Sequence, residues 1–318
     1  MFHKTEGSDL GMDRLDAMRL VLAVVDEGSL SAAARRLGLP LSTVSRRLSD
    51  LEAHLAARLL VRSNRRVALT EAGAAYAAAS RRILDQVAEA ERAVAGEYAV
   101  PRGELVITAP MVFGRLHVLP LVTGFLRAHP AVTVRLQLAD RVLHLHDDHL
   151  DLAVRIGDLP DSSMVAVRVG AIRRVICASP AYLAARGTPT LPADLAGHDC
   201  IAFTGAGGSE AWRLGPADGR GGGAGGGGLR IHARLVVNTA EAAVDAAIAG
   251  LGLTRVLSYQ VAAAVAAGRL VRVLDAADAA TIPVSLVHLG QAPLPQKLRA
   301  FLDFAGPRLR SSLAAGPA

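Results

Sequence analysis

The chain has 318 residues, with 35 Lys plus Arg, 29 Asp plus Glu, a formal net charge of +6 and a pI of about 10.0. This length is enough for two or three structural units, and the basic balance suits a polyanionic partner. The two cysteines, Cys177 and Cys200, argue against a secreted disulfide scaffold, and no run reaches the roughly 18 uncharged apolar residues of a membrane span.

The N-terminus is polar and has no signal-peptide core, so residues 1–11 are expected to be a flexible extension. A helix follows over residues 13–27 and ends at Gly28. Its apolar spacing predicts one buried stripe. That stripe comprises Leu15, Met18, Leu22 and Val25.

Residues 29–55 predict two short helices joined by a glycine turn. Ser29 or Ser31 can cap the first helix, and Gly38 supplies the left-handed residue that ends it. Ser42 is the expected N-cap of the second helix. The apolar residues of that helix recur at spacings of 4, 3 and 4, which places them on one buried face. They are Val44, Leu48, Leu51 and Leu55.

The opposite face of this second helix carries hydroxyls and guanidinium groups, which are the groups that contact phosphates and base edges. The pattern therefore predicts a helix that lies in the DNA major groove. A solvated face on an unrelated three-helix domain is the alternative. The face is formed by Ser42, Thr43, Ser45, Arg46, Arg47 and Ser49.

A basic hairpin is predicted next. Two short apolar strands, residues 59–61 and 67–69, flank a tip that contains Arg65 and Arg66. Such a wing can lie along phosphates or reach a minor groove, and we include Arg62 in this DNA-contacting set. Residues 12–69 hold ten arginines and six acids, a surplus of four positive charges that is clustered in the winged unit.

Residues 12–73 resemble the N-terminal domain of the LysR-type transcriptional regulators. The resemblance rests on Ser42-x-Val44-Ser45, Leu48, Leu51-Glu52 and Leu55, followed by Arg62 and Leu69-Thr70-x-x-Gly73. Many members of the family have a polar residue where this chain has Leu41, a side chain that can touch a thymine methyl group. The resemblance implies a winged helix-turn-helix domain over residues 12–69.

A long linker helix is predicted over residues 70–98. A narrow stripe with spacings of 4, 3, 4, 3 and 4 is typical of pairing between two chains, and half-site reading of DNA needs a dimer. The stripe comprises Tyr76, Ser80, Ile83, Val87, Ala90 and Val94. The resemblance further implies that dimers associate into a tetramer.

From residue 101 onwards, predicted strands alternate with helices, which indicates an α/β domain with a largely parallel sheet. Strands are expected at 104–108, 132–138, 150–156, 251–257, 270–274 and 283–288, and a second sheet is expected to start at 173–178. Helices are expected at 115–129, from Asn238 to Gly250, and at 294–304.

These segments resemble the effector domain of the same family, which is similar to periplasmic solute-binding proteins. The most recognisable pieces are residues 151–158, 250–253 and 258–260. The resemblance implies an effector-binding domain over 101–318 whose two lobes enclose a small-molecule cleft. Lobe I comprises 101–170 and 275–318, and lobe II comprises 171–274.

Candidate effector-binding residues lie where strands end and helices begin, because ligands of open α/β sheets bind beyond the carboxyl strand ends and free helix N–H groups attract anions. We expect an organic acid or a neutral metabolite. Each residue has an alternative role as a helix cap or a core side chain. The set is Thr108, Pro110, Met111, Phe113, Phe203, Thr204 and Asn238.

Three other motifs are given structural interpretations. The glycine-rich residues 219–228 lack the Lys and Ser/Thr of a P-loop and are read as a flexible connection. His144, His146 and His149 are read as a surface segment rather than a metal site, and the cysteines as buried thiols rather than a redox pair. No catalytic triad or carboxylate pair is recognisable.

The sequence thus predicts a cytoplasmic transcription regulator that binds double-stranded DNA and a small-molecule effector. It is expected to need no cofactor or metal, to have no enzymatic activity and to have no membrane partner. The rival interpretations are a small-molecule-binding or transport-related protein, whose winged unit serves protein contacts, and an enzyme.

Overall fold

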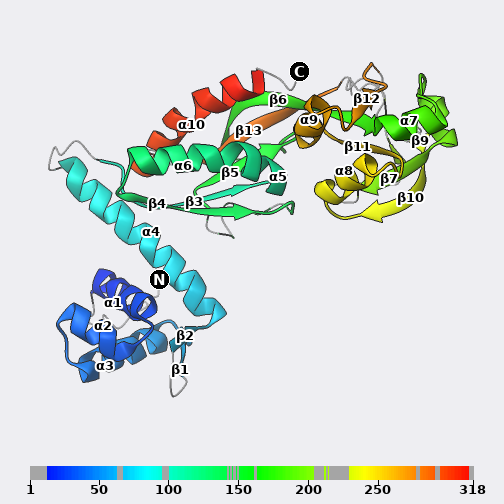
Figure 1. Cartoon of the computed structure of the whole chain (residues 1–318). Coiled ribbons are helices and arrows are strands. Elements are labelled where there is room, and N and C mark those ends of the chain that lie inside the picture. The colour runs from blue at the N-terminus through cyan, green and yellow to red at the C-terminus, as the bar shows by residue number, and fades with distance from the viewer. Residues whose placement is uncertain are drawn as a thin grey trace, which may run out of the picture. The chain divides into compact units, whose positions relative to one another are not determined.

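The computed structural model describes residues 13–62, 67–94, 100–141, 143, 145, 148, 150–160, 163–203, 211–212, 214, 229–276, 280–290 and 294–314. The chain divides into two compact units, residues 1–99 and residues 100–318 (Figure 1). The expected extension at residues 1–11 lies outside the described residues.

The first unit is a helix-turn-helix followed by a two-stranded antiparallel hairpin and a long helix. Ser29 caps α2, and Gly28 and Gly38 end α1 and α2 in the left-handed conformation, as predicted. The elements are α1 (Arg14–Glu27), α2 (Leu30–Leu37), α3 (Leu41–His54), β1 (Leu60–Arg62), β2 (Val67–Leu69) and α4 (Glu71–Val94).

The core of this unit corrects two predicted stripes. The predicted stripe of α1 is only half-buried, and the fully buried residues are its neighbours Leu20, Val21 and Val24. Both stripes of α1 are apolar, so spacing alone could not select the buried one. In α3, Val44, Leu48 and Leu51 are buried as predicted, whereas Leu55 follows the end of the helix and is exposed.

The hairpin is fixed to the helices by Glu52 of α3 and by the Leu69-Thr70-x-x-Gly73 motif. The Glu52 carboxylate accepts hydrogen bonds from the amides of Leu59 and Leu60, at 2.8 and 3.1 Å. The Thr70 hydroxyl donates to the Leu59 carbonyl and accepts from the Gly73 amide. A Cβ on Gly73 would overlap that same carbonyl group, so only glycine allows this close approach.

The long helix α4 does not present the predicted stripe as one free seam. Tyr76 packs against the core of the winged unit, and Ser80 is fully buried in this unit. Further along the helix, Ile83 and Ala90 are exposed and Val87 is half-buried. The side chain of Val94 is not described. Within this unit, only the later part of the stripe is available to another chain.

The second unit is built on a nine-stranded sheet with the order β10-β7-β11-β6-β13-β5-β3-β4, and β12 also pairs with β6. The strands are β3 (Gly103–Ala109), β4 (Val132–Leu138), β5 (Leu152–Ile156), β6 (Met164–Ala178), β7 (Asp199–Phe203), β10 (His232–Val237), β11 (Leu253–Leu257), β12 (Val271–Val273) and β13 (Thr281–Leu289). A separate pair is formed by β8 (Ala211–Trp212) and β9 (Leu229–Arg230).

One prediction about this sheet is wrong, and another is confirmed. The sheet is mixed rather than largely parallel, because β13 runs antiparallel to β5 and β6, and β6 runs antiparallel to β11 and β12. The second sheet expected to start at 173–178 is confirmed in the pairing, since residues 174–178 of β6 pair with β11 and β12, whereas residues 164–173 pair with β13. The sequence did not indicate that β6 is one strand of 15 residues that belongs to both halves.

Helices cover the sheet. They are α5 (Met111–Phe113), α6 (Leu119–Ala128), α7 (Pro180–Arg186), α8 (Ala240–Ile248), α9 (Ser258–Ala266) and α10 (Gln296–Ala314), with a π-helical turn η1 (Gly114–Val118) and a 3₁₀ turn η2 (Pro192–Gly197). The helix predicted at 115–129 therefore begins earlier, and the helix predicted at 294–304 continues for ten more residues, past Pro307.

The stretch Met111–Ala128 is long and apolar enough to cross a membrane by length and composition alone. Its side chains Val112, Phe113, Val122 and Phe125 are buried in the core of the sheet domain. Other apolar side chains of the stretch, Met111, Leu116 and Leu119, are exposed, so it has the one buried face of an amphipathic helix that covers a sheet.

The motif at residues 151–158 holds neighbouring segments together. The Asp151 carboxylate accepts from the Val106 amide at 2.8 Å, and Arg155 donates to the Leu143 carbonyl. The buried Lys297 ammonium of α10 lies 3.9 Å from the same Asp151 carboxylate and donates to the Glu104 carbonyl. The motif therefore joins β3, Leu143 and α10 to β5.

The two cysteines are both buried, as predicted, and the geometry excludes a disulfide between them. Cys177 of β6 and Cys200 of β7 are separated by β11, which pairs with both strands, so their Cα atoms lie about 10 Å apart at ordinary strand spacing. A disulfide needs less than about 7 Å. Burial also raises the pKa of both thiols to about 12.

Candidate nucleic-acid interface and ligand site

The outward face of α3 is exposed and polar. Ser42 and Arg46 are exposed, and Thr43, Ser45 and Arg47 are half-buried. Arg46 and Arg47 form no ion pair with any residue that the structure describes, so both guanidinium groups remain available to an anion.

The start of α3 differs from the prediction. Pro40, not Ser42, is the N-cap residue, and it provides no side-chain cap. Leu41 is the first helical residue and is 48% exposed. The Ser42 hydroxyl is therefore not used as a cap. Ser42 lies beside Leu41 at the N-terminal end of α3, which is the end that contacts base edges in helix-turn-helix proteins.

The predicted wing is described only in part. The strands β1 and β2 pair in the register Leu60↔Leu69, so the hairpin exists as expected. The side chain of Arg62, and the whole of Arg65 and Arg66, lie outside the described residues. Their DNA contacts remain predictions.

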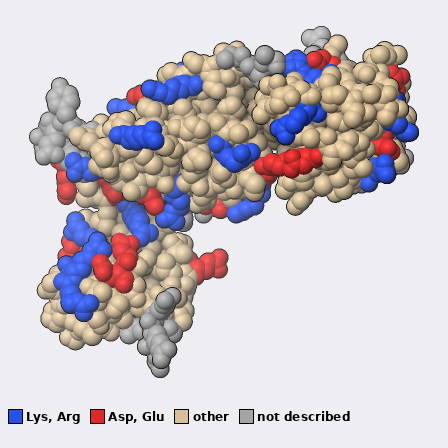
Figure 2. All heavy atoms as spheres, in the orientation of Figure 1, with Lys and Arg blue, Asp and Glu red and all other residues tan. Residues whose placement is uncertain are grey.

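Not every arginine of the unit is available. Arg36 lies 3.3 Å from Glu27 and 3.7 Å from Asp26, and Arg81 lies 2.6 Å from Asp26. Basic and acidic side chains accordingly lie next to each other on the visible face of this unit (Figure 2). Among the residues that the structure describes, the arginines of α3 thus differ from Arg36 and Arg81 in having no ion-pair partner.

In the second unit, four predicted ligand residues follow one another at the carboxyl end of β3. Thr108 is 1% exposed, Pro110 is the N-cap residue of α5, and Met111 is 43% exposed. Phe113 is fully buried in the core. The Asp140 carboxylate accepts the Met111 amide at 3.0 Å, so this helix start already has an anionic partner.

The other predicted residues end the neighbouring parallel strands β7 and β10. Phe203 is half-buried, packs against the cores of both halves of the sheet domain and is paired with Val237, so Asn238 follows at the same edge. Asn238 is exposed and does not cap α8, because Thr239 accepts the Ala242 amide instead. Thr204 lies outside the described residues.

An aromatic cluster that the sequence did not reveal packs the first group against α9. The ring of Phe113 lies edge-on to Tyr259 of α9 at 5.3 Å, and His117 lies 4.7 Å from Phe113 and 5.7 Å from Tyr259. Burial raises the pKa of Tyr259, with further increases from the charges of Asp140 and Glu241. Burial lowers the pKa of His117, whose Nε2 has no hydrogen-bond partner.

Asp140 could have been found from sequence, since it follows a predicted strand at its carboxyl end. His117 could not, because only the wide π-helical turn places it against α9. Within the described residues no group of three His, Cys, Asp or Glu could hold a metal ion. The three histidines at 144, 146 and 149, and the glycine-rich residues 219–228, lie outside the description.

Comparison with known proteins gives matches over both units. Residues 15–74 match the family described as bacterial regulatory helix-turn-helix protein, lysR family, and residues 99–310 match the LysR substrate binding domain. An HTH-type transcriptional regulator of Xanthomonas campestris pv. campestris is 35% identical, covering 91% of this chain and 84% of its own length.

The transcriptional regulator CrgA of Neisseria meningitidis serogroup C is 32% identical, with 94% of this chain and 98% of CrgA covered. The solved structure of CrgA, a LysR-type transcriptional regulator from Neisseria meningitidis, matches with a TM-score of 0.58 and 30% identity, over 94% of this chain and 99% of that chain.

Proposed function

Because this chain belongs to the LysR family of transcriptional regulators, with a helix-turn-helix DNA-binding domain and an effector-binding domain, we propose specific roles for its residues. The helix α3 enters the major groove, where Ser42, Thr43, Ser45, Arg46 and Arg47 contact DNA. The side chains of Arg62, Arg65 and Arg66 in the wing bind phosphates.

The observation that carries this proposal is the pair of arginines on α3 that have no ion-pair partner among the described residues, in a unit where Arg36 and Arg81 are paired. The test is an electrophoretic mobility shift on the DNA upstream of the protein's own gene. Arg46→Ala should relax base preference at one position and cost about 1–3 kcal/mol. Arg66→Ala should weaken binding to all sequences alike and flatten the salt dependence by about one slope unit.

Unchanged affinity of both variants would contradict this docking. Arg36→Ala is the matched control, because it removes an arginine that already pairs with Glu27 and Asp26. Its effect on DNA affinity should be small, because Arg36 belongs to α2 rather than α3 and its charge is already offset by two carboxylates.

We further propose that α4 joins two chains, that dimers associate into a tetramer, and that the protein works in the cytoplasm, where its DNA is. Dimeric pairing supplies the two-fold symmetry that half-site recognition requires. No enzymatic role is proposed for either unit, since the predicted ligand residues include no paired general acid and base.

The effector is proposed to lie between the two lobes, residues 101–170 with 275–318 and residues 171–274, against Thr108, Pro110, Met111, Phe113, Phe203, Thr204 and Asn238. Of the two ligand classes expected from the sequence, an organic acid is disfavoured at α5. The Asp140 carboxylate accepts the Met111 amide, so a second anion there would be repelled. A neutral metabolite is therefore the favoured class.

The test of this ligand site is Thr108→Val, which keeps the shape of the side chain and removes its hydroxyl. The variant should blunt the effect of the true effector on a DNA footprint and leave the ligand-free affinity for DNA unchanged. If the variant responds like wild type, Thr108 is a core residue and the ligand site lies elsewhere. A ligand can act as a signal only if it binds one arrangement of the lobes more tightly than the other.

A further inference from the structure

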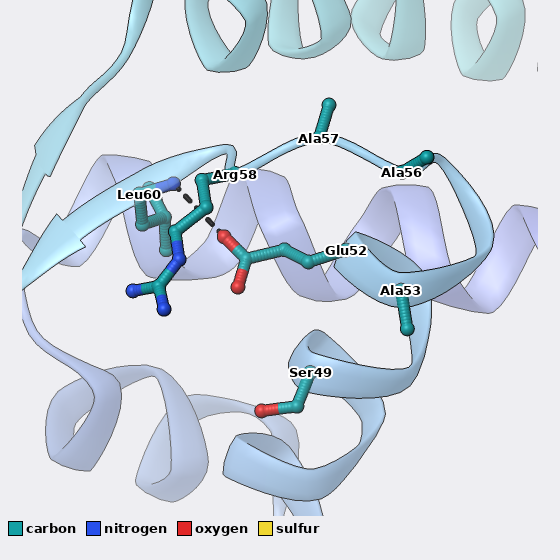
Figure 3. Close-up of a pocket in the computed structure, with 7 residues that line it drawn as sticks. All are labelled: Ser49, Glu52, Ala53, Ala56, Ala57, Arg58 and Leu60. Carbon is teal, nitrogen blue, oxygen red and sulfur yellow. Dashed lines mark hydrogen bonds between the residues drawn. The ribbon is translucent and has the colours of Figure 1, made fainter.

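A hollow of about 500 Å³ lies between the second half of α3 and the start of β1, the strand that leads into the wing (Figure 3). It shares Ser49 with the α3 face predicted from the sequence to contact DNA, and it opens on the surface of the winged unit. Its lining consists of Ser49, Glu52, Ala53, Ala56, Ala57, Arg58 and Leu60.

The hollow continues the outward face of α3. Ser42, Arg46, Ser49 and Ala53 follow each other at spacings of 4, 3 and 4, opposite the buried Val44, Leu48 and Leu51. Ser49 and Ala53 belong both to this outward row and to the wall of the hollow. The opposite wall, residues 57–60, leads directly into the wing.

The lining chemistry suits a phosphate. Arg58 is exposed and forms no ion pair with a described residue, and Figure 3 shows its guanidinium group and the Ser49 hydroxyl pointing into the same hollow. Ser49 donates to the Ser45 carbonyl at 3.0 Å, a bond that its rotatable hydroxyl can exchange for a phosphate oxygen. Ala53, Ala56 and Ala57 add only methyl groups, so a chain can approach closely.

Glu52 is the one acidic group in the lining, and its charge is already engaged. Its Oε1 accepts from the amides of Leu59 and Leu60, at 2.8 and 3.1 Å. Hydrogen bonds from two backbone amides offset part of the negative charge that would otherwise repel an anion. The guanidinium of Arg58 lies on the facing side of the hollow, so the local charge is balanced before an anion enters.

We propose that this hollow receives the sugar-phosphate strand of DNA that separates two grooves, with Arg58 bound to one phosphate. A helix in the major groove and a wing directed at the adjacent minor groove lie on either side of that strand. The strand must therefore cross between α3 and β1, where the hollow is. This inference rests on the proposed docking of α3 and adds a contact that fixes register without reading sequence.

The first test is the salt dependence of DNA binding by Arg58→Ala. Each phosphate contact contributes about −0.9 to the slope of log affinity against log salt, so losing one should flatten the slope by about 0.9 per bound protomer. That corresponds to about a fivefold loss of affinity at 0.15 M salt, equal for specific and unrelated sequences. Arg58→Lys should retain the slope, because it retains the charge.

The matched control is Arg19→Ala. It deletes the same charge from the same unit, but on α1, where Arg19 pairs with Asp16 at 3.0 Å. Its slope should stay at the wild-type value. Ala53→Gln fills the hollow without changing its charge and should also weaken binding to all sequences. Thermal unfolding of each variant shows that the unit remains folded, since both arginines are exposed.

The second test locates the phosphate. In DNA that carries single neutral methylphosphonates, one position per half-site should weaken wild-type binding by about fivefold and leave Arg58→Ala unaffected. The hollow is not a phosphate site if two results are found for Arg58→Ala. Its salt slope equals the wild-type slope, and methylphosphonates weaken its binding at every position where they weaken wild-type binding. If Arg46→Ala also binds like wild type, the docking of α3 itself is wrong and this inference fails with it.

Discussion

Gly73→Ala should destabilise the winged unit by about 2 kcal/mol, because the first turn of α4 lies directly on the Leu59 carbonyl. A Cβ at this position would overlap both the carbon and the oxygen of that carbonyl and lie 3.0 Å from Leu69 Cδ2. Relief requires α4 to move away from β1. That movement breaks the three hydrogen bonds from Thr70 to the preceding segment: its amide donates to the Leu59 carbonyl at 3.0 Å, and its hydroxyl donates to the carbonyls of Leu59 and Arg58 at 3.2 and 2.7 Å.

Each of these bonds is worth about 1 kcal/mol, and alanine regains about 1 kcal/mol over glycine in a helix, which leaves about 2 kcal/mol. Amide exchange in the first turns of α4 should accelerate about thirtyfold, and DNA affinity should fall because the wing loses its support. Ala74→Gly, at the exposed neighbouring position, is the control and should accelerate exchange only about fivefold. Wild-type protection in Gly73→Ala would refute the proposed constraint.

Three other variants test separate features. Val87→Asp places a charge on the later part of the α4 stripe and should lower the oligomeric state measured by sedimentation velocity. Gln86→Asp, at an exposed neighbouring position, is the control and should leave the oligomeric state unchanged. A monomeric wild type at micromolar concentration would exclude the proposed pairing. Burial lowers the pKa of His117, so below pH 6.5 the unfolded chain binds a proton that the folded chain resists, and the unfolding free energy falls as pH falls through that value. His117→Phe should lose less stability than wild type between pH 7.5 and 5.5, followed by the fluorescence of the single Trp212; equal losses would mean that His117 does not contribute. Ala56 adopts the left-handed conformation at φ 49°, so Ala56→Gly should raise the stability of the winged unit by roughly 0.5–1 kcal/mol in urea unfolding, and a decrease would show that the turn is not strained.

The helix-turn-helix could be predicted closely because local chemistry fixes it. Gly28, Ser29 and Gly38 each perform a capping role that depends on one residue type. The buried stripe of α1 and the first residue of α3 could not be predicted in this way, because in each case the sequence offers two alternatives of similar stability. Two apolar stripes run along α1, and either could face the core. The N-cap of α3 is Pro40, so this helix begins at Leu41, before Ser42.

The sheet of the second unit was harder to predict because strand partners are not local. The strands at 104–108 and 132–138 were placed correctly, yet the pairing of β13 between β5 and β6 joins residues over 100 positions apart. The cluster of Phe113, His117 and Tyr259 likewise depends on a π-helical turn and on tertiary packing. The spacing of apolar residues along helices and strands contains no information on strand partners or on this cluster.

The motif residues that carry the resemblance to the LysR family are largely residues whose side chains form hydrogen bonds within this chain. Glu52, Thr70 and Asp151 each bond to backbone groups of a neighbouring segment, so these side chains hold the hairpin and the sheet in place. A side chain committed in this way contributes little to a partner. The proposed recognition therefore rests on outward groups such as Leu41 and Arg46, which no motif requires to be the same in two regulators. The same reasoning separates Arg58 from Glu52 inside one hollow, since the Glu52 carboxylate holds the start of β1, whereas the Arg58 guanidinium is proposed to bind a DNA phosphate.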